Sequence, residues 1–394
     1  MLSTVDLPQP LGPTTLRKLP ARTSEEILST AATRNRIGQT LRGPVPALVP
    51  GRRRAGGPWP WQPKPSRLRY HFCQVAPILQ LRSLVKEYPG HRALDDVSLS
   101  IDAGSFFSLL GPSGCGKTTT LRLIAGFEQP TAGEVLLNGE VVNHRQPYQR
   151  NVSTVFQSYA LFPHLNARQN IEFGLRRRRA TEIARRVRDV IELVSLAGKE
   201  DRRPAQLSGG ERQRVALARS MVLEPDVLLL DEPLAALDPK LRQQMRLELK
   251  ALQRRVGIAF LLVTHDQEEA LSMSDRLAVM NAGRIEQTGS PEEVYLRPGT
   301  RFVAGFLGAV NWIDGIGVRP EATRIARAGG SGTHASRPAV VTGSVFLGDC
   351  VQVLASLASG EQAVAQVSRE LAVFQPGDPV ELYWHPADEI TFPA

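Results

Sequence analysis

The most informative segment of this sequence reads Phe106-Phe107-Ser108-Leu109-Leu110-Gly111-Pro112-Ser113-Gly114-Cys115-Gly116-Lys117-Thr118. Its first five residues are almost continuously apolar, which is typical of a strand buried on both faces of a parallel sheet. Its last eight match the pattern G-x-x-x-x-G-K-[ST] at every fixed position, and this pattern predicts a phosphate-binding loop. The residues from Thr118 to Ala125 are predicted to form the helix that follows such a loop. A strand, a glycine-rich turn and a helix in this order indicate an α/β fold around a phosphate site.

The chemistry of the loop explains its residue types. Glycines allow successive backbone N–H groups to turn toward phosphate oxygens, because no Cβ stands in the way. Lys117 is expected to neutralise the β- and γ-phosphates, and the Thr118 hydroxyl is expected to ligate Mg²⁺. The N-terminus of the following helix favours the same anion through its dipole. The predicted nucleotide-binding set is Gly111, Ser113, Gly114, Cys115, Gly116, Lys117, Thr118 and Thr119.

Two acidic residues follow a second apolar strand, at Val227–Leu230. A strand that ends in a carboxylate is a common way to place a Mg²⁺ ligand beside a phosphate loop. Asp231 is therefore predicted to hold the metal, through a water molecule. Glu232 is one residue further on, where it could polarise an attacking water as a general base.

The segment Leu207-Ser208-Gly209-Gly210-Glu211-Arg212-Gln213 resembles the signature motif of the ATP-binding-cassette family. The resemblance implies ATP and Mg²⁺ as cofactors, and two cassettes that close head to tail around two ATP molecules. Each signature loop would then contact the nucleotide of the opposite subunit through Ser208, Gly209 and Gly210, since a hydroxyl and glycine amides at a helix start form an anion cradle. Asp238 matches the loop that crosses the seam between the two subunits in that family.

Three further positions match motifs of the same family. Gln157 resembles the glutamine of a loop that touches Mg²⁺ and the attacking water, and His265 resembles the switch histidine that contacts the γ-phosphate. Tyr88 fits the aromatic residue that stacks on adenine. The predicted catalytic residues are therefore Glu232, His265 and Gln157, and the predicted metal contacts are Thr118, Gln157 and Asp231.

The rest of the chain divides into three predicted parts. Residues 77–308 form the cassette with its helical subdomain. Residues 309–394 carry short alternating runs at Val340–Phe346, Val351–Leu354, Ala363–Val367 and Pro379–Trp384, separated by turn signals such as Gly348-Asp349. This pattern predicts a small β-barrel, and it resembles the accessory OB-like domain found in solute importers.

Residues 1–76 contain 11 of the 29 prolines and show no sustained periodicity, so this leader is predicted to be disordered or to follow from a start codon assigned too far upstream. A targeting peptide is the alternative. The leader holds 12 Lys/Arg and 3 Asp/Glu, which leaves 36 of each sign in the remainder (48 less 12, and 39 less 3). The net charge of +9 therefore belongs to the leader, and it is no argument for nucleic acid as a partner.

These features predict the ATPase subunit of a bacterial solute importer. The resemblance implies three kinds of partner: a second copy of the chain, two transmembrane permease subunits and, indirectly, an extracytoplasmic solute-binding protein. The longest apolar runs are too short to span a membrane, so we expect a peripheral position on the cytoplasmic face of the inner membrane. An ABC ATPase without a transport role is the alternative, but neither a second cassette nor a long coiled-coil insertion is present in the sequence.

Two segments bear on the solute. Asn151–Gln157 and Phe302–Gly308 are most similar to the corresponding segments of spermidine/putrescine importer ATPases. Sugars, iron, sulfate and phosphonates are the alternative solutes. The arginine run Arg176–Arg179 is interpreted as a solvated face, with a lipid contact as the alternative.

Overall fold

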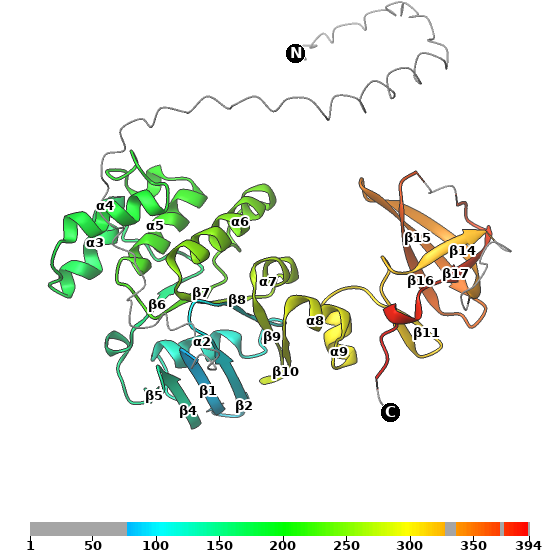
Figure 1. Ribbon diagram of the computed structural model, residues 1–394, viewed down its shortest axis with the longest axis horizontal. Coiled ribbons are helices and arrows are strands. Elements are labelled where there is room, and N and C mark those ends of the chain that lie inside the picture. Colours follow the sequence, from blue (N-terminus) through cyan, green and yellow to red (C-terminus); the bar gives the residue numbers. More distant parts are fainter. Residues whose placement is uncertain (1–76, 328–335, 371–373, 393–394) are drawn as a thin grey trace, which may run out of the picture. The chain divides into compact units, whose positions relative to one another are not determined.

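The computed structural model describes residues 77–327, 336–370 and 374–392. The prediction made for residues 1–76 lies outside these ranges. Figure 1 shows an α/β cassette followed by a sheet of strands near the C-terminus. None of the helices in the described ranges combines the length and the apolarity that crossing a membrane would require.

The cassette is built on a six-stranded sheet in the order β10-β9-β3-β8-β7-β6. The strands from β9 to β6 are parallel, and β10 joins β9 in antiparallel fashion. Their bounds are β3 Phe106–Leu110, β6 Val152–Val155, β7 Val227–Asp231, β8 Ala259–Thr264, β9 Arg276–Asn281 and β10 Arg284–Gly289. The three strands predicted from apolar runs, β3, β7 and β8, therefore lie side by side at the centre of this sheet.

Alternation along these strands divides the interior into two cores. Phe106, Leu230 and Phe260 face one core, where they pack with residues of the helices. Phe107 and Leu229 face the other core, where they pack with α2 and a second sheet. Successive side chains of a strand point to opposite faces, so a continuous apolar run supplies both cores at once.

The second sheet is antiparallel, in the order β2-β1-β4-β5. Its strands are β1 Leu79–Tyr88, β2 His91–Ile101, β4 Ala132–Leu137 and β5 Glu140–Val141. The alternating patterns at Leu79–Leu81 and Val97–Ile101 correctly indicated β1 and β2, but both strands extend further than those patterns. Ser83 in β1 and Asp96 in β2 have positive φ angles, and the pairing of these two strands is irregular. This irregularity explains why simple alternation of buried and exposed residues is lost.

The helices cover the six-stranded sheet and its ends. They are α2 Lys117–Ala125, α3 Ala167–Arg177, α4 Ile183–Leu193, α5 Gly209–Met221, α6 Pro239–Val256, α7 Gln267–Met273, α8 Pro291–Leu296 and α9 Arg301–Phe306. The helices α3, α4 and α5 contact one another and form the predicted helical subdomain (Figure 1). Side chains cap two of them: Asn166 accepts from Gln169 N at the start of α3, and Ser208 does the same for Glu211 N at the start of α5.

The C-terminal part contains a five-stranded sheet in the order β13-β17-β14-β15-β16, and a short pair, β11 with β12. The strands are β11 Asn311–Ile313, β12 Ile316–Val318, β13 Arg324–Arg327, β14 Ser336–Phe346, β15 Cys350–Leu357, β16 Gln362–Ser368 and β17 Pro379–Tyr383. Alternate residues of β15 (Val351, Val353, Ala355 and Leu357) are buried in a core of their own. The four predicted runs correspond to the strands β14, β15, β16 and β17.

Arg319 joins this part to the end of the cassette. The guanidinium is 4% exposed and donates to the carbonyl oxygens of Ala304, Gly308, Ala309 and Tyr295 at 2.8–3.2 Å. It also lies over the Tyr295 ring, 4.3 Å from the centroid. A cation at the end of a helix satisfies the last carbonyl groups and complements the dipole, so Arg319 closes α9.

Candidate nucleotide site

Four parallel strands present the candidate site at their carboxyl ends. The phosphate loop follows β3, and His265 directly follows β8. Asp231 ends β7, Glu232 directly follows it, and Gln157 lies just beyond β6. Because β3, β8, β7 and β6 are neighbours in that order, these residues meet at one edge of the sheet. Ligands of open α/β sheets bind at this edge.

The phosphate loop places a buried ammonium group inside a turn of backbone. Lys117 is 5% exposed, and its Nζ donates to the carbonyl oxygens of Gly111 at 2.7 Å and Pro112 at 2.8 Å. A Cβ on Gly111 would approach the carbonyl oxygen of Met280 to 2.2 Å, so this position requires glycine. Gly116 has φ +104° and precedes α2 without a side-chain cap. The first turn of α2 is therefore open to an anion rather than closed by its own sequence.

The Glu232 carboxylate lies between the two other residues predicted to be catalytic. One of its oxygens is 2.9 Å from Nδ1 of His265, and the other accepts from Nε2 of Gln157 at 3.4 Å. Glu232 has φ +44°, a conformation that an L-residue other than glycine rarely adopts. Its own N–H donates to the carbonyl oxygen of Val263 at 3.0 Å, which holds the residue in that conformation. Strain of this kind is frequently found at functional sites.

A cavity of about 130 Å³ adjoins this trio, and its lining includes Gln157, Glu232 and His265. Five residues of the lining were not predicted from the sequence: Ala235, Arg242, Thr264, Asp266 and Glu269. Arg242 pairs with Asp266 at 3.4 Å, and the Thr264 hydroxyl donates to Glu269 at 2.7 Å. Asp266 directly follows His265 in the sequence and could have been suspected, whereas Arg242 is on α6 and reaches the site only through the fold.

Asp231 carries the electrostatic signal of a cation site. Burial, followed by the charge of Glu232, raises the pKa of Asp231, and the charges of Arg122 and Lys117 oppose that effect. A divalent cation would relieve the same penalty. Thr118, Gln157 and Asp231 supply only oxygen ligands, which suits Mg²⁺. Within the described ranges no group of three or more His, Cys, Asp or Glu could hold a metal.

Tyr88 ends β1 with its side chain 38% exposed. Lys86 lies over its ring, 5.0 Å from the centroid, and its hydroxyl donates to Glu128. The side chain of Thr119, next to the phosphate loop residues, acts on the pKa of Tyr88, which places this ring near the loop. Burial and the hydrogen bond to Glu128 together raise that pKa.

Ser208 and Asp238 do not line this cavity, and each is the N-cap of its own helix. The Ser208 hydroxyl accepts from Glu211 N at 3.3 Å, and Asp238 accepts from Leu241 N at 3.0 Å. The two loops touch each other, because a Cβ on Gly209 would lie 3.1 Å from the Leu237 side chain. In a single chain, the signature segment and the Asp238 segment therefore form a second, exposed surface.

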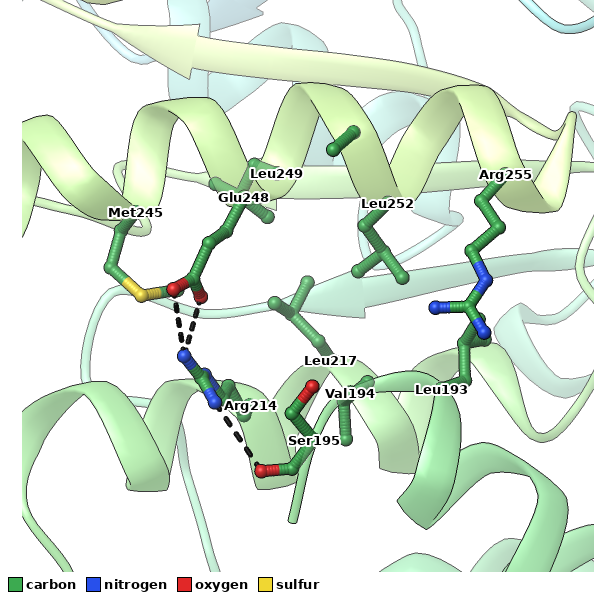
Figure 2. A pocket seen from close by; sticks show the side chains of 11 residues that line it. Leu193, Val194, Ser195, Arg214, Leu217, Met245, Glu248, Leu249, Leu252 and Arg255 are labelled. Atoms are coloured by element: carbon green, nitrogen blue, oxygen red, sulfur yellow. Dashed lines mark hydrogen bonds and ion pairs between the residues drawn. The ribbon is translucent and has the colours of Figure 1, made fainter. Parts of the chain in front are cut away.

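A further cavity of about 290 Å³ lies between the end of α4, α5 and α6 (Figure 2). Arg214 of α5 forms two hydrogen bonds with Glu248 of α6, at 2.7 and 2.8 Å, and donates to the carbonyl oxygen of Ser195 at 3.3 Å. None of the residues that line this cavity belongs to the predicted nucleotide site. The cavity is a feature of the packing between α5 and α6.

Two protein-family models match this chain. Residues 94–235 match the family model of the ABC transporter, and residues 316–392 match that of the TOBE domain. The chain is 47% identical, over 78% of its length and 91% of the relative, to a spermidine/putrescine import ATP-binding protein of Rubrobacter xylanophilus. It is 46% identical, over 79% of its length and 92% of the relative, to the protein of the same name from Acidothermus cellulolyticus.

Among solved structures, the chain is similar to cbiO1 from Clostridium perfringens, part of the ABC transporter complex cbiONQ. The TM-score is 0.52 and the identity 30%, over 56% of this chain and 90% of that chain. The match to relatives over nine-tenths of their length is decisive, because it includes both the cassette and the C-terminal sheet. The chain therefore belongs to the ABC transporter family, as an ATPase subunit that joins a nucleotide-binding cassette to a C-terminal TOBE domain.

Proposed function

We propose that this chain hydrolyses ATP to energise a bacterial importer of spermidine and putrescine. The observation that carries the catalytic part is the position of Glu232 between Gln157 and His265, at the sheet edge that also presents the phosphate loop. The solute is inferred from the two curated relatives, whose names describe spermidine/putrescine import.

In the proposed reaction, the chain positions a water molecule and neutralises charge on the transferred phosphoryl group. Lys117 and the first turn of α2 hold the phosphates, and the exposed ring of Tyr88 stacks on adenine. Glu232 accepts the proton of the attacking water, Gln157 orients that water, and His265 contacts the γ-phosphate. The hydrogen bond between His265 and Glu232 keeps the carboxylate directed toward the reacting water.

Thr118, Asp231 and Gln157 are the residues that would hold Mg²⁺. When bound, the ion supplies charge neutralisation on the phosphate oxygens. The raised pKa of Asp231 supports this assignment, because the carboxylate is held where it lacks sufficient solvation of its own.

A second copy of the chain completes each site in this proposal. The exposed Ser208 and Asp238 segments of one chain face the ATP bound by the other. A mixing experiment tests this arrangement. Ser208→Arg and Lys117→Ala should each abolish hydrolysis alone, and a mixture should recover activity, because one heterodimer site keeps both an intact phosphate loop and an intact signature. No recovery at any mixing ratio would contradict the two-chain site.

Two aromatic pairs support a dock for permease subunits near Gln157. Phe127 and Phe156 have ring centroids 6.1 Å apart, and Phe162 and Phe173 have centroids 4.5 Å apart. Phe127, Phe156 and Phe173 are 53%, 36% and 40% exposed. Exposed aromatic residues are enriched at protein interfaces. In this proposal they hold the chain at the cytoplasmic face of the inner membrane, below a solute-binding protein on the other side.

The solute is tested in the assembled importer. The chain is reconstituted in lipid with its own permease subunits and solute-binding protein, and ATP hydrolysis is measured with each solute. Spermidine or putrescine should stimulate hydrolysis several-fold, whereas maltose, ferric iron, sulfate and phosphonate should not. Stimulation by one of those solutes and none by polyamines would replace the proposed solute.

A further inference from the structure

A group of arginines lies at the junction of α3 and α4. Arg177, Arg178, Arg179 and Arg188 are all exposed, and we call these four residues the arginine face. In the part of the chain that the structure describes, the recorded ion pairs include none of them. Figure 1 shows α3 and α4 as neighbours in the helical subdomain.

Most of the acids around the arginine face are already engaged. Residues 172–192 contain seven arginines and four acids, a local charge of +3. Glu172 pairs with Arg176 at 3.0 Å, Asp189 pairs with Arg185, and Glu182 also pairs with Arg185. Arg186 reaches Glu224, on a different segment, at 2.9 Å. The neighbouring arginines thus engage three of the four carboxylates, while Glu192, one turn beyond Arg188 on α4, is in none of the ion pairs recorded for the described residues. Arg177, Arg178 and Arg179 therefore carry most of the uncompensated positive charge of the arginine face.

The arginine face adjoins an aromatic pair of the proposed permease dock. Phe173 precedes Arg177 by four residues in α3, so the two lie on the same side of that helix. Phe173 is 40% exposed and packs on Phe162, in the loop that follows Gln157. In the proposed function the dock faces the permease subunits, which lie in the membrane. The arginine face adjoins the dock, so it would lie beside the permease and close to the membrane surface.

We propose that the arginine face binds the anionic headgroups of the cytoplasmic leaflet. The inference rests on the proposed function, since it takes the dock to face the membrane. Basic residues close to an anionic bilayer gain favourable energy, and the interaction decays within about a Debye length, roughly 8 Å at physiological salt. Guanidinium groups match phosphate oxygens in two-point hydrogen bonds, and like charges held together on one surface repel until anions approach.

A solvated face is the simpler interpretation of an arginine run, and the sequence alone favours it. The structure weighs against it in two ways: three of the nearest acids, Glu172, Glu182 and Asp189, pair with other arginines, and the exposed Phe173 side chain lies beside the run. Nucleic acid is another polyanion that basic residues bind through phosphate contacts. The exposed Phe173 beside the arginine face, part of the proposed permease dock, favours a headgroup plane, and a nucleic-acid oligomer in the experiment distinguishes the two.

The test compares two triple variants of the full chain with matched loss of charge. Arg177→Gln, Arg178→Gln and Arg179→Gln remove three charges from the arginine face. Arg254→Gln, Arg276→Gln and Arg324→Gln remove three exposed arginines that lie elsewhere and have no recorded ion pair in the described ranges. Binding is measured by cosedimentation with phosphatidylcholine vesicles, with and without phosphatidylglycerol. The basic leader is present in both variants and therefore affects them equally.

We expect the first variant to bind anionic vesicles on the order of 100-fold more weakly, at about fivefold per arginine. The control variant should bind these vesicles about as well as the parent does. Lysine at positions 177, 178 and 179 should restore most of the binding. Added salt should weaken the binding of the parent. Both triple variants should hydrolyse ATP normally in solution. A loss no larger than that of the control, or a loss seen only with a nucleic-acid oligomer, would overturn the inference.

These vesicles contain no permease. Failure here would therefore leave the proposed importer function standing, and failure of solute stimulation would leave the lipid measurement unaffected.

Discussion

At the scale of single residues, Glu232 is the most informative position. A left-handed backbone, a contact with His265 and a hydrogen bond from Gln157 all meet at one carboxylate. An amide keeps the shape of this side chain but cannot accept a proton. Glu232→Gln should therefore slow hydrolysis by about 10²–10⁴-fold, while ATP still binds.

Single-turnover hydrolysis and size-exclusion chromatography with ATP check this prediction, and ATP-bound dimer should accumulate in the variant. The control is Glu292→Gln, which changes an exposed carboxylate of α8 and should leave turnover unchanged. Turnover near the parental rate in Glu232→Gln would remove Glu232 from the role of base.

The raised pKa of Asp231 predicts that removing its charge stabilises the fold and weakens Mg²⁺ binding. Its folded-state pKa is raised above the ordinary value of 3.8, so its contribution to stability is full below that value and is lost as pH rises through the folded pKa. Asp231→Asn removes the cost of a buried charge. At pH 7.5, without nucleotide, it should raise the melting temperature of the cassette by about 2 °C, since 1 kcal/mol corresponds to about 2–4 °C in a domain of 150–250 residues.

The same variant should lose the extra stabilisation that ATP with Mg²⁺ gives over ATP with EDTA, because the metal ligand is gone. Thermal melts measure both effects. They are recorded for the parent and the variant without nucleotide, with ATP and Mg²⁺, and with ATP and EDTA. A variant less stable than the parent without nucleotide would show that the Asp231 carboxylate serves the fold rather than the cation.

At the scale of elements, α5 and α6 are joined by the Arg214–Glu248 pair (Figure 2). Both helices start at segments that we assign to the opposite subunit's ATP, so this pair holds Ser208 and Asp238 in one geometry. A double-mutant cycle with Arg214→Gln and Glu248→Gln should give a coupling energy of about 1 kcal/mol, at the upper end for partly exposed pairs because two hydrogen bonds are involved.

Urea denaturation of the four proteins measures this coupling. The exposed pair Arg145–Glu140 provides the matched control, and its cycle should give less than about 0.5 kcal/mol. Equal coupling energies in the two cycles would show that the two hydrogen bonds from Nη2 of Arg214 to the Glu248 carboxylate add nothing.

At the scale of the whole molecule, Arg319 holds the C-terminal sheet to the end of the cassette. Lysine keeps the charge but cannot span four carbonyl groups. Arg319→Lys should therefore destabilise the C-terminal part by on the order of 3 kcal/mol and leave ATP affinity unchanged, since no site residue is touched.

Calorimetry should resolve a separate, earlier transition for the C-terminal sheet in this variant. Arg324→Lys, at an exposed position of β13, is the control and should melt like the parent. A single transition at the parental temperature in Arg319→Lys would show that other contacts are sufficient to hold the sheet.

By itself, the sequence determined the chemistry of this protein. The phosphate loop, the acids after Val227–Leu230 and the signature at Ser208 are short motifs, and each contains both its chemistry and its local structure within a few residues. Alternation and apolar runs identified the strands for the same reason, since side chains two residues apart share a face. Where bulges interrupt the alternation, as in β1 and β2, the strand bounds were too short.

The tertiary structure alone decided which residues became partners across the chain. Arg242 reaches Asp266 from α6, Arg214 finds Glu248 at a separation of 34 residues, and Arg319 reaches Tyr295 across 24. It also decided which arginines between Arg176 and Arg188 form ion pairs with acids in the described part of the chain. Such pairings depend on packing between elements, and neither periodicity nor motif spacing carries that information.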